Sequence, residues 1–170
     1  MENRISQGYW IWCQFDKDSM DELKLIYKKV NEVFNGPFFN VHITISGPLV
    51  SINNNIIDNF YSLKKKFQSI ELDLNKYSFS EDTYESFFID VKNSKILMHF
   101  KCNIDREFNI LNNNYKPHIS LFYGEESKNN KKKLISELPK LPNCVNLDKL
   151  CLVKIDEDIN KWYIEHEIFL

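Results

Sequence analysis

The spacing of apolar residues along the chain predicts seven strands and four helices. Apolar residues at every second position indicate strands, and apolar residues three or four apart indicate helices. Strands are expected over residues 8–15, 41–47, 70–75, 84–91, 117–124, 145–155 and 161–170. Helices are expected over residues 19–34, 53–67, 94–108 and 127–138. Strands and helices therefore alternate in an α+β order, with two hairpins.

Polar residues before the helices predict where these helices begin. Ser19 and Glu22 are three positions apart, which is the spacing of a capping box, so the first helix is expected to start at Ser19. The asparagines at 53–55 are expected to open the second helix, and Ser127 to cap the fourth.

The strand expected over 41–47 places two kinds of side chain on its two faces. Ile43 and Ile45 point to one face, whereas His42, Thr44 and Ser46 point to the other. A strand that buries isoleucines and directs a histidine and two hydroxyls elsewhere is typical of the wall of a cleft.

The strand expected over 117–124 repeats this arrangement 76 residues later (118 − 42). His118 and Ser120 are again two positions apart, and Gly124 follows as Gly47 follows in the first copy. Two copies in one chain of 170 residues indicate an internal duplication with a site between the halves. We therefore expect one domain over residues 1–170, in which two pseudo-symmetric lobes of antiparallel sheet and helices surround a central groove.

Composition narrows the classes of partner. A net charge of −2 argues against an extended surface for a nucleic-acid backbone but leaves room for a small phosphorylated ligand. No apolar run has the roughly 20 residues of a membrane span, and the sequence start does not resemble a signal peptide, so a cytoplasmic protein is expected. A monomer is also expected. The four cysteines, Cys13, Cys102, Cys144 and Cys151, lack zinc-site spacing, so neither a metal nor another cofactor is expected.

Two histidines that face each other across a groove can divide the work of a general base and a general acid, since the ordinary pKa of histidine is about 6.5. The hydroxyls of Thr44 and Ser120 are expected on the same face, where each can donate a hydrogen bond to a phosphate oxygen. The pattern therefore favours hydrolysis of a phosphodiester without a metal.

The His-x-Thr and His-x-Ser motifs, one in each half, resemble the signature of the 2H phosphoesterase superfamily. Within it the chain is most similar to the cyclic phosphodiesterases of the plant and fungal type. This resemblance implies a bilobal fold and an enzyme that opens a ribose cyclic phosphate, such as a nucleoside 2′,3′-cyclic phosphate or ADP-ribose 1″,2″-cyclic phosphate. It also implies that His42, Thr44, His118 and Ser120 are catalytic and that Tyr123 holds the phosphate.

Three further expectations concern substrate binding. Strict alternation puts Tyr123 on the opposite face from Ser120, so its role requires a bulge or bend before Gly124. Aromatic residues near the groove are candidates to stack a base, namely Trp12 and one residue of the Phe87–Phe88 pair, with Phe87 preferred.

Two other functions remain open at this stage. The same site can serve a 2H phosphodiesterase that cleaves 2′-5′-linked or cyclic oligonucleotide signals, because the sequence does not give the width of the groove. A binding module that captures a cyclic phosphate without cleaving it is the third hypothesis, although both histidines of the motifs are present.

Overall fold

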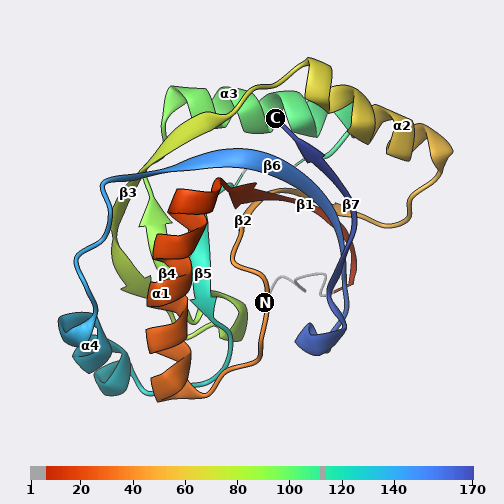
Figure 1. Ribbon diagram of the computed structural model, residues 1–170. Coiled ribbons are helices and arrows are strands. Elements are labelled where there is room, and N and C mark those ends of the chain that lie inside the picture. Colours follow the sequence, from red (N-terminus) through yellow and green to blue (C-terminus); the bar gives the residue numbers. More distant parts are fainter. Residues whose placement is uncertain (1–6, 112–113) are drawn as a thin grey trace.

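Strands and helices follow the predicted order in the computed structural model, which describes residues 7–111 and 114–170 (Figure 1). The strands are β1 (Gly8–Phe15), β2 (Ile43–Leu49), β3 (Ile70–Phe79), β4 (Phe87–Val91), β5 (His118–Phe122), β6 (Cys144–Ile155) and β7 (Tyr163–Phe169). The α-helices are α1 (Lys17–Phe34), α2 (Asn54–Ser62), α3 (Lys95–Glu107) and α4 (Lys128–Glu137). Short 3-10 helices are η1 (Leu63–Lys65), η2 (Thr83–Glu85) and η3 (Ile159–Lys161).

Polar side chains cap the helices, and the predicted start of the first helix was wrong. Helix α1 begins at Lys17 because Asp16 caps it, accepting a hydrogen bond from the Ser19 N–H at 2.8 Å. The Ser19 hydroxyl instead accepts from the backbone N–H of Asn146 in β6, at 3.0 Å. The predicted caps Asn53 and Ser127 are confirmed.

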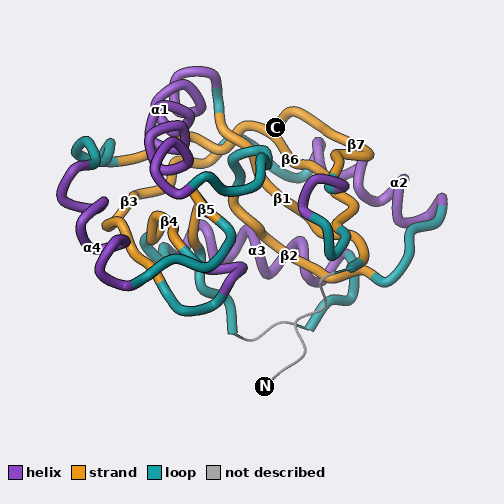
Figure 2. Tube along the Cα trace, turned by 90° about the horizontal axis from the view of Figure 1, so that it is seen from below, coloured by secondary structure: helices purple, strands orange, loops and turns teal. Residues whose placement is uncertain are grey.

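The strands pair antiparallel in one sheet with the order β1-β2-β5-β4-β3-β6-β7. An additional pairing of β1 with β6 closes six of these strands into a ring, and β7 extends β6. In Figure 2, β3, β4 and β5 lie on one side of the molecule, and β1, β2, β6 and β7 on the other. The β2–β5 and β3–β6 pairings join these two groups of strands.

Helices cover the strands from different directions. Helix α1 packs against β1 and β5, and α3 packs against β2 and β3 (Figure 1). The apolar faces predicted from periodicity supply the core, including Leu23, Val30, Leu97, Phe100 and Ile104 from the two helices. None of the helices in the described residues combines the length and hydropathy that a membrane crossing requires.

Candidate functional site

The two histidine motifs meet where β2 pairs with β5. Ile43 pairs directly with Ile119, and both isoleucines are fully buried. Counting outward from an antiparallel pair, His42 lies opposite Ser120, on the face away from the isoleucines. The histidine of the first motif is therefore the cross-strand neighbour of the hydroxyl of the second.

The same register places Thr44 opposite His118, so the relation between the two motifs is reciprocal. His42 and His118 are then diagonal neighbours, a geometry in which the residues are about 7–8 Å apart. The two histidines are close enough for their charges to interact, because His118 contributes to lowering the pKa of His42. The structure thus brings together the four residues of the two motifs.

Both imidazoles are held in the same way. His42 Nδ1 lies 2.6 Å from the carbonyl oxygen of Asn40, and His118 Nδ1 lies 2.9 Å from the carbonyl oxygen of Lys116. In each case the acceptor is two residues upstream in the sequence. A carbonyl only accepts hydrogen bonds, so Nδ1 carries the proton of each neutral ring and Nε2 carries the lone pair.

His42 is buried among aromatic rings. Its ring is stacked on the Trp12 indole, with centroids 3.5 Å apart and 9° between the planes, and meets the Phe39 ring edge-on at 6.1 Å. Burial lowers the pKa of His42 to about 3, with the Asn40 carbonyl opposing the change and His118 adding to it. His42 is therefore uncharged near neutral pH.

His118 has a more open position than His42. It is half-buried at the start of β5, and the Phe88 ring lies 5.1 Å away at 56°. Asp90 pairs with His118 across β4 and β5, and its carboxylate accepts a hydrogen bond from the Ser78 hydroxyl at 2.7 Å. The two copies of the motif therefore share their geometry but differ in their surroundings.

The bulge predicted before Gly124 is confirmed. Phe88 of β4 pairs with Ser120, but the preceding residue of β4 pairs with Phe122, so Leu121 is an extra residue in β5. This extra residue returns Tyr123 to the face of Ser120, which hydrogen-bonds with it. Burial raises the pKa of Tyr123, and the Ser120 hydrogen bond opposes that rise. The Tyr123 hydroxyl is thus neutral and lies next to the motif residues.

The preference for Phe87 as a base-stacking residue was wrong. Its side chain is 0% exposed and packs edge-on against Phe34, with ring centroids 5.7 Å apart. Alternation along β4 turns Phe87 into the core and Phe88 toward His118. Phe88 is therefore the aromatic residue of this hairpin that borders the site.

Trp12 lies in the site, but it contacts a histidine. It is 3% exposed, one face of its indole is covered by His42, and Trp162 meets it edge-on at 5.7 Å. The indole thus keeps the His42 ring in place and excludes water from one side of it.

A buried polar network behind the motif strand was missed at the sequence level. The Tyr115 hydroxyl donates to the Thr44 carbonyl oxygen at 3.0 Å, and the Lys101 ammonium lies 5.1 Å from the Tyr115 ring centroid. Lys101 also forms an ion pair with Asp105, whose carboxylate accepts from the Ser46 hydroxyl. The expected place of Ser46 on the face of His42 was therefore wrong, because the register between β1 and β2 shifts between Thr44 and Ser46. The sequence did contain a signal for this ion pair, because Lys101 and Asp105 are four residues apart in a predicted helix.

A second set of contacts fixes the segment before His42. The N–H of Phe39 donates to the Tyr27 hydroxyl oxygen at 3.2 Å, and this hydroxyl donates to the carbonyl oxygen of Pro37 at 3.3 Å. Helix α1 therefore supports the loop that carries the Asn40 carbonyl, and through it the His42 ring.

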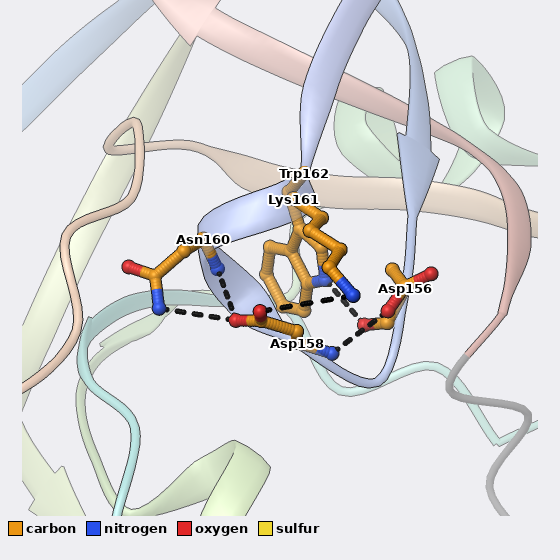
Figure 3. Close-up of polar contacts among 5 residues, drawn as sticks. All are labelled: Asp156, Asp158, Asn160, Lys161 and Trp162. Atoms are coloured by element: carbon orange, nitrogen blue, oxygen red, sulfur yellow. Dashed lines mark hydrogen bonds and ion pairs between the residues drawn. The ribbon is translucent and has the colours of Figure 1, made fainter.

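A cavity of about 110 Å³ adjoins the His42 side of the site. Trp12, Phe39 and Asn40, which all contact His42, form part of its wall. The tip of the β6–β7 hairpin supplies another part, including Asn160 and Trp162 (Figure 3). Trp162 contacts both Trp12 and Tyr123, so this tip touches both halves of the site.

The described residues contain no group of three His, Cys, Asp or Glu side chains arranged to hold a metal ion. The functional groups of the site are two imidazoles, the hydroxyls of Thr44 and Ser120, and the Tyr123 hydroxyl. That set can move protons and can donate hydrogen bonds to a tetrahedral anion.

Comparisons with known proteins agree with this geometry. A family model described as the 2′-5′ RNA ligase superfamily matches residues 20–159. No curated protein matches the chain.

Solved structures share the fold at low sequence identity. The crystal structure of Escherichia coli LigT in its apo form has a TM-score of 0.66 and 12% identity, and the match covers 96% of this chain and 97% of LigT. LigT complexed with 3′-AMP has a TM-score of 0.61 and 10% identity, and the match covers 97% of this chain and 98% of LigT. The protein TT0787 of Thermus thermophilus has a TM-score of 0.60 and 11% identity, and the match covers 95% of this chain and 97% of TT0787. The predicted α+β fold of the 2H phosphoesterases is therefore confirmed.

Proposed function

The chain belongs to the 2′-5′ RNA ligase superfamily, the 2H phosphoesterases, and we propose that it is a metal-independent enzyme that hydrolyses a ribose cyclic phosphate of a small nucleotide. The observation that carries the proposal is the pairing of Ile43 with Ile119, which sets the two histidine motifs side by side on one face. Each motif then offers an imidazole Nε2 and a hydroxyl to the same space.

His42 acts as the general base in this proposal. It is buried against Trp12, it is uncharged at neutral pH, and its Nδ1–H is bound to the Asn40 carbonyl. The free lone pair on Nε2 accepts a proton from a water molecule as the water oxygen forms a bond to phosphorus.

His118 acts as the general acid. Its position at the start of β5 is more open than that of His42, and Asp90 is its cross-strand neighbour. As the bond from phosphorus to the ribose oxygen breaks, Nε2–H of His118 donates its proton to that oxygen. The products are a phosphate monoester and a free ribose hydroxyl, and proton exchange with solvent restores both histidines.

Hydroxyl groups bind the phosphate in this mechanism. Thr44 and Ser120 are cross-strand neighbours of the two histidines, and Tyr123 joins Ser120 through the β5 bulge. Three O–H donors directed at the non-bridging oxygens stabilise the charge that develops there, which is the function of an oxyanion hole.

Turnover of nucleoside 2′,3′-cyclic phosphates and of ADP-ribose 1″,2″-cyclic phosphate tests the proposal. We expect His42→Ala and His118→Ala each to lower kcat by about 10²–10⁴-fold, and His99→Ala, an exposed histidine of α3, to leave it unchanged. Phosphorus NMR of the product identifies which ribose oxygen leaves. Equal turnover in the two site variants and wild type would exclude the proposed site, and loss of activity in a chelator would exclude the metal-independent mechanism.

A second substrate class is favoured by the description of the matched family, which refers to 2′-5′ linkages. The same histidine pair would then hydrolyse a 2′-5′-linked oligonucleotide. A competition assay between a cyclic mononucleotide and a 2′-5′-linked trinucleotide separates the two classes. A crystal structure of LigT is complexed with 3′-AMP, which supports a small nucleotide as the substrate class, and the net charge of −2 favours the mononucleotide.

Two narrower hypotheses stay predictions. The similarity to plant and fungal cyclic phosphodiesterases rests on the resemblance in sequence, above all in the two histidine motifs. A binding module without catalysis would show calorimetric binding of a cyclic nucleotide without a product.

A further inference from the structure

The tip of the β6–β7 hairpin is held in one conformation by its own polar groups (Figure 3). The Asp156 carboxylate accepts from the N–H of Asp158 at 3.0 Å, and the Asp156 carbonyl oxygen accepts from the Trp162 indole N–H at 2.6 Å. Asp158 Oδ1 accepts from both the backbone N–H and the side-chain Nδ2 of Asn160, each at 3.0 Å. The conformation of the tip is therefore stabilised by contacts within the tip itself.

These contacts orient the Asn160 amide. A carboxylate only accepts hydrogen bonds, so the group that faces Asp158 is the amide nitrogen. The Asn160 oxygen Oδ1 consequently points away from Asp158, as Figure 3 shows. Asn160 is one of the residues that line the cavity beside His42, and its amide oxygen is not bound by Asp158.

The remaining wall of this cavity is mostly aromatic, with Ile159 and Ile164 beside the rings. Phe38, which is 73% exposed, lies at its rim, and Trp162 and Tyr163 come from the hairpin. None of the described residues that line it carries a charge. A cavity needs about 10–15 Å³ to hold one water molecule. The cavity of about 110 Å³ therefore has room for a ring of several atoms.

We infer that this cavity binds the base of the nucleotide and that Asn160 selects bases with an exocyclic amino group. The inference rests on the proposed function for the position of the phosphate. A wall of aromatic rings without charges fits the uncharged planar part of a nucleotide, and rings stack on bases of every kind. The acceptor Oδ1 adds selectivity, because the amino groups of adenine and cytosine donate where the corresponding oxygens of hypoxanthine and uracil do not.

Two pairs of substrates test the inference, since each pair differs mainly by an amino group and an oxygen. These are the 2′,3′-cyclic phosphates of adenosine and inosine, and those of cytidine and uridine. One neutral hydrogen bond corresponds to about a three- to tenfold preference in kcat/KM for the amino member of each pair. Asn160→Ala should abolish this preference, whereas Phe38→Ala should lower kcat/KM for all four substrates alike. Asn129→Ala, at an exposed position of α4, is the matched control.

Calorimetric binding of adenosine and inosine 3′-monophosphates gives a second readout that needs no turnover. The inference is overturned if wild type shows no preference by either readout, or if Asn160→Ala lowers all four substrates equally, since Asn160 then only supports the loop. If wild type opens no cyclic phosphate but Asn160→Ala still removes a binding preference, the proposed function fails and the base site stands.

Discussion

The imidazole of His42 lies flat on the indole of Trp12, with ring centroids 3.5 Å apart and 9° between the planes. His118 has no such partner in the described structure; its nearest aromatic contact, Phe88, is tilted by 56° at 5.1 Å. Two motifs that are alike in sequence are therefore unlike in their surroundings. This difference is the basis for assigning the base to His42 and the acid to His118.

Burial of His42 should make the stability of the protein depend on pH. Its folded pKa of about 3 lies below the ordinary value of 6.5, so the folded state binds fewer protons than the unfolded state between these values. The free energy of unfolding is thus highest above about pH 6.5 and falls toward lower pH. Between about pH 6.5 and 5 this histidine contributes at most about 1.4 kcal/mol per pH unit.

The measurement is urea unfolding of wild type and His42→Gln across that range, where most carboxylates stay ionised. We expect the variant to lose less stability on acidification than wild type does. His99→Gln changes an exposed histidine and should follow the wild-type curve. Parallel curves for wild type and His42→Gln would contradict the low pKa of His42.

The division of roles between the histidines can be tested with a substrate that does not need an acid. Nitrophenolate leaves from phosphorus without protonation, so bis(4-nitrophenyl) phosphate removes the demand on the general acid. We expect His118→Ala to lose about 10²–10⁴-fold in kcat on a cyclic nucleotide but much less on this ester. His42→Ala should lose activity on both substrates, because water must still be activated. The reverse result would exchange the two roles.

Much of the fold was predictable from local patterns in the sequence. The order of strands and helices followed from periodicity, and Asn53 and Ser127 marked the starts of two helices as their N-caps. For these elements the information lay within a few neighbouring residues. The bulge in β5 was expected for a different reason, because the family resemblance gives Tyr123 a role that strict alternation along the strand would prevent.

The closure of the sheet and the surroundings of the histidines could not be predicted. The β1–β6 pairing joins residues more than a hundred positions apart, and no local pattern specifies that register. The Trp12–His42 stack depends on how β1 lies beside β2, where two register shifts occur. The choice between Phe87 and Phe88 depended on which face of β4 meets the core.

The buried ion pair behind the motif strand should be important for stability. The Lys101 side chain is 1% exposed and that of Asp105 is 14% exposed, so Lys101→Met leaves a largely buried carboxylate without its cation. We expect this change to lower the free energy of unfolding by about 3–5 kcal/mol. The double variant Lys101→Met/Asp105→Leu should recover most of the loss.

Lys28→Met is the matched control for that measurement. Lys28 and Glu32 have the same spacing on a helix, but their side chains are 75% and 61% exposed. Loss of this surface pair should cost about 0.5 kcal/mol or less. Similar losses in the free energy of unfolding for Lys28→Met and Lys101→Met would show that burial does not make the Lys101 pair more important for stability.

Removal of the Tyr123 hydroxyl should separate catalysis from packing. Tyr123→Phe keeps the ring contacts with Phe39 at 4.3 Å and Trp162 at 5.5 Å but loses the hydrogen bond with Ser120. We expect kcat to fall about 10²-fold, as for loss of one oxyanion donor, while the free energy of unfolding changes by about 1 kcal/mol. Tyr77→Phe loses a hydroxyl that donates to the Pro139 carbonyl oxygen at 2.8 Å, outside the site, and should keep wild-type kcat. Unchanged kcat in Tyr123→Phe would reduce Tyr123 to a packing residue, because its ring is then all that the site requires.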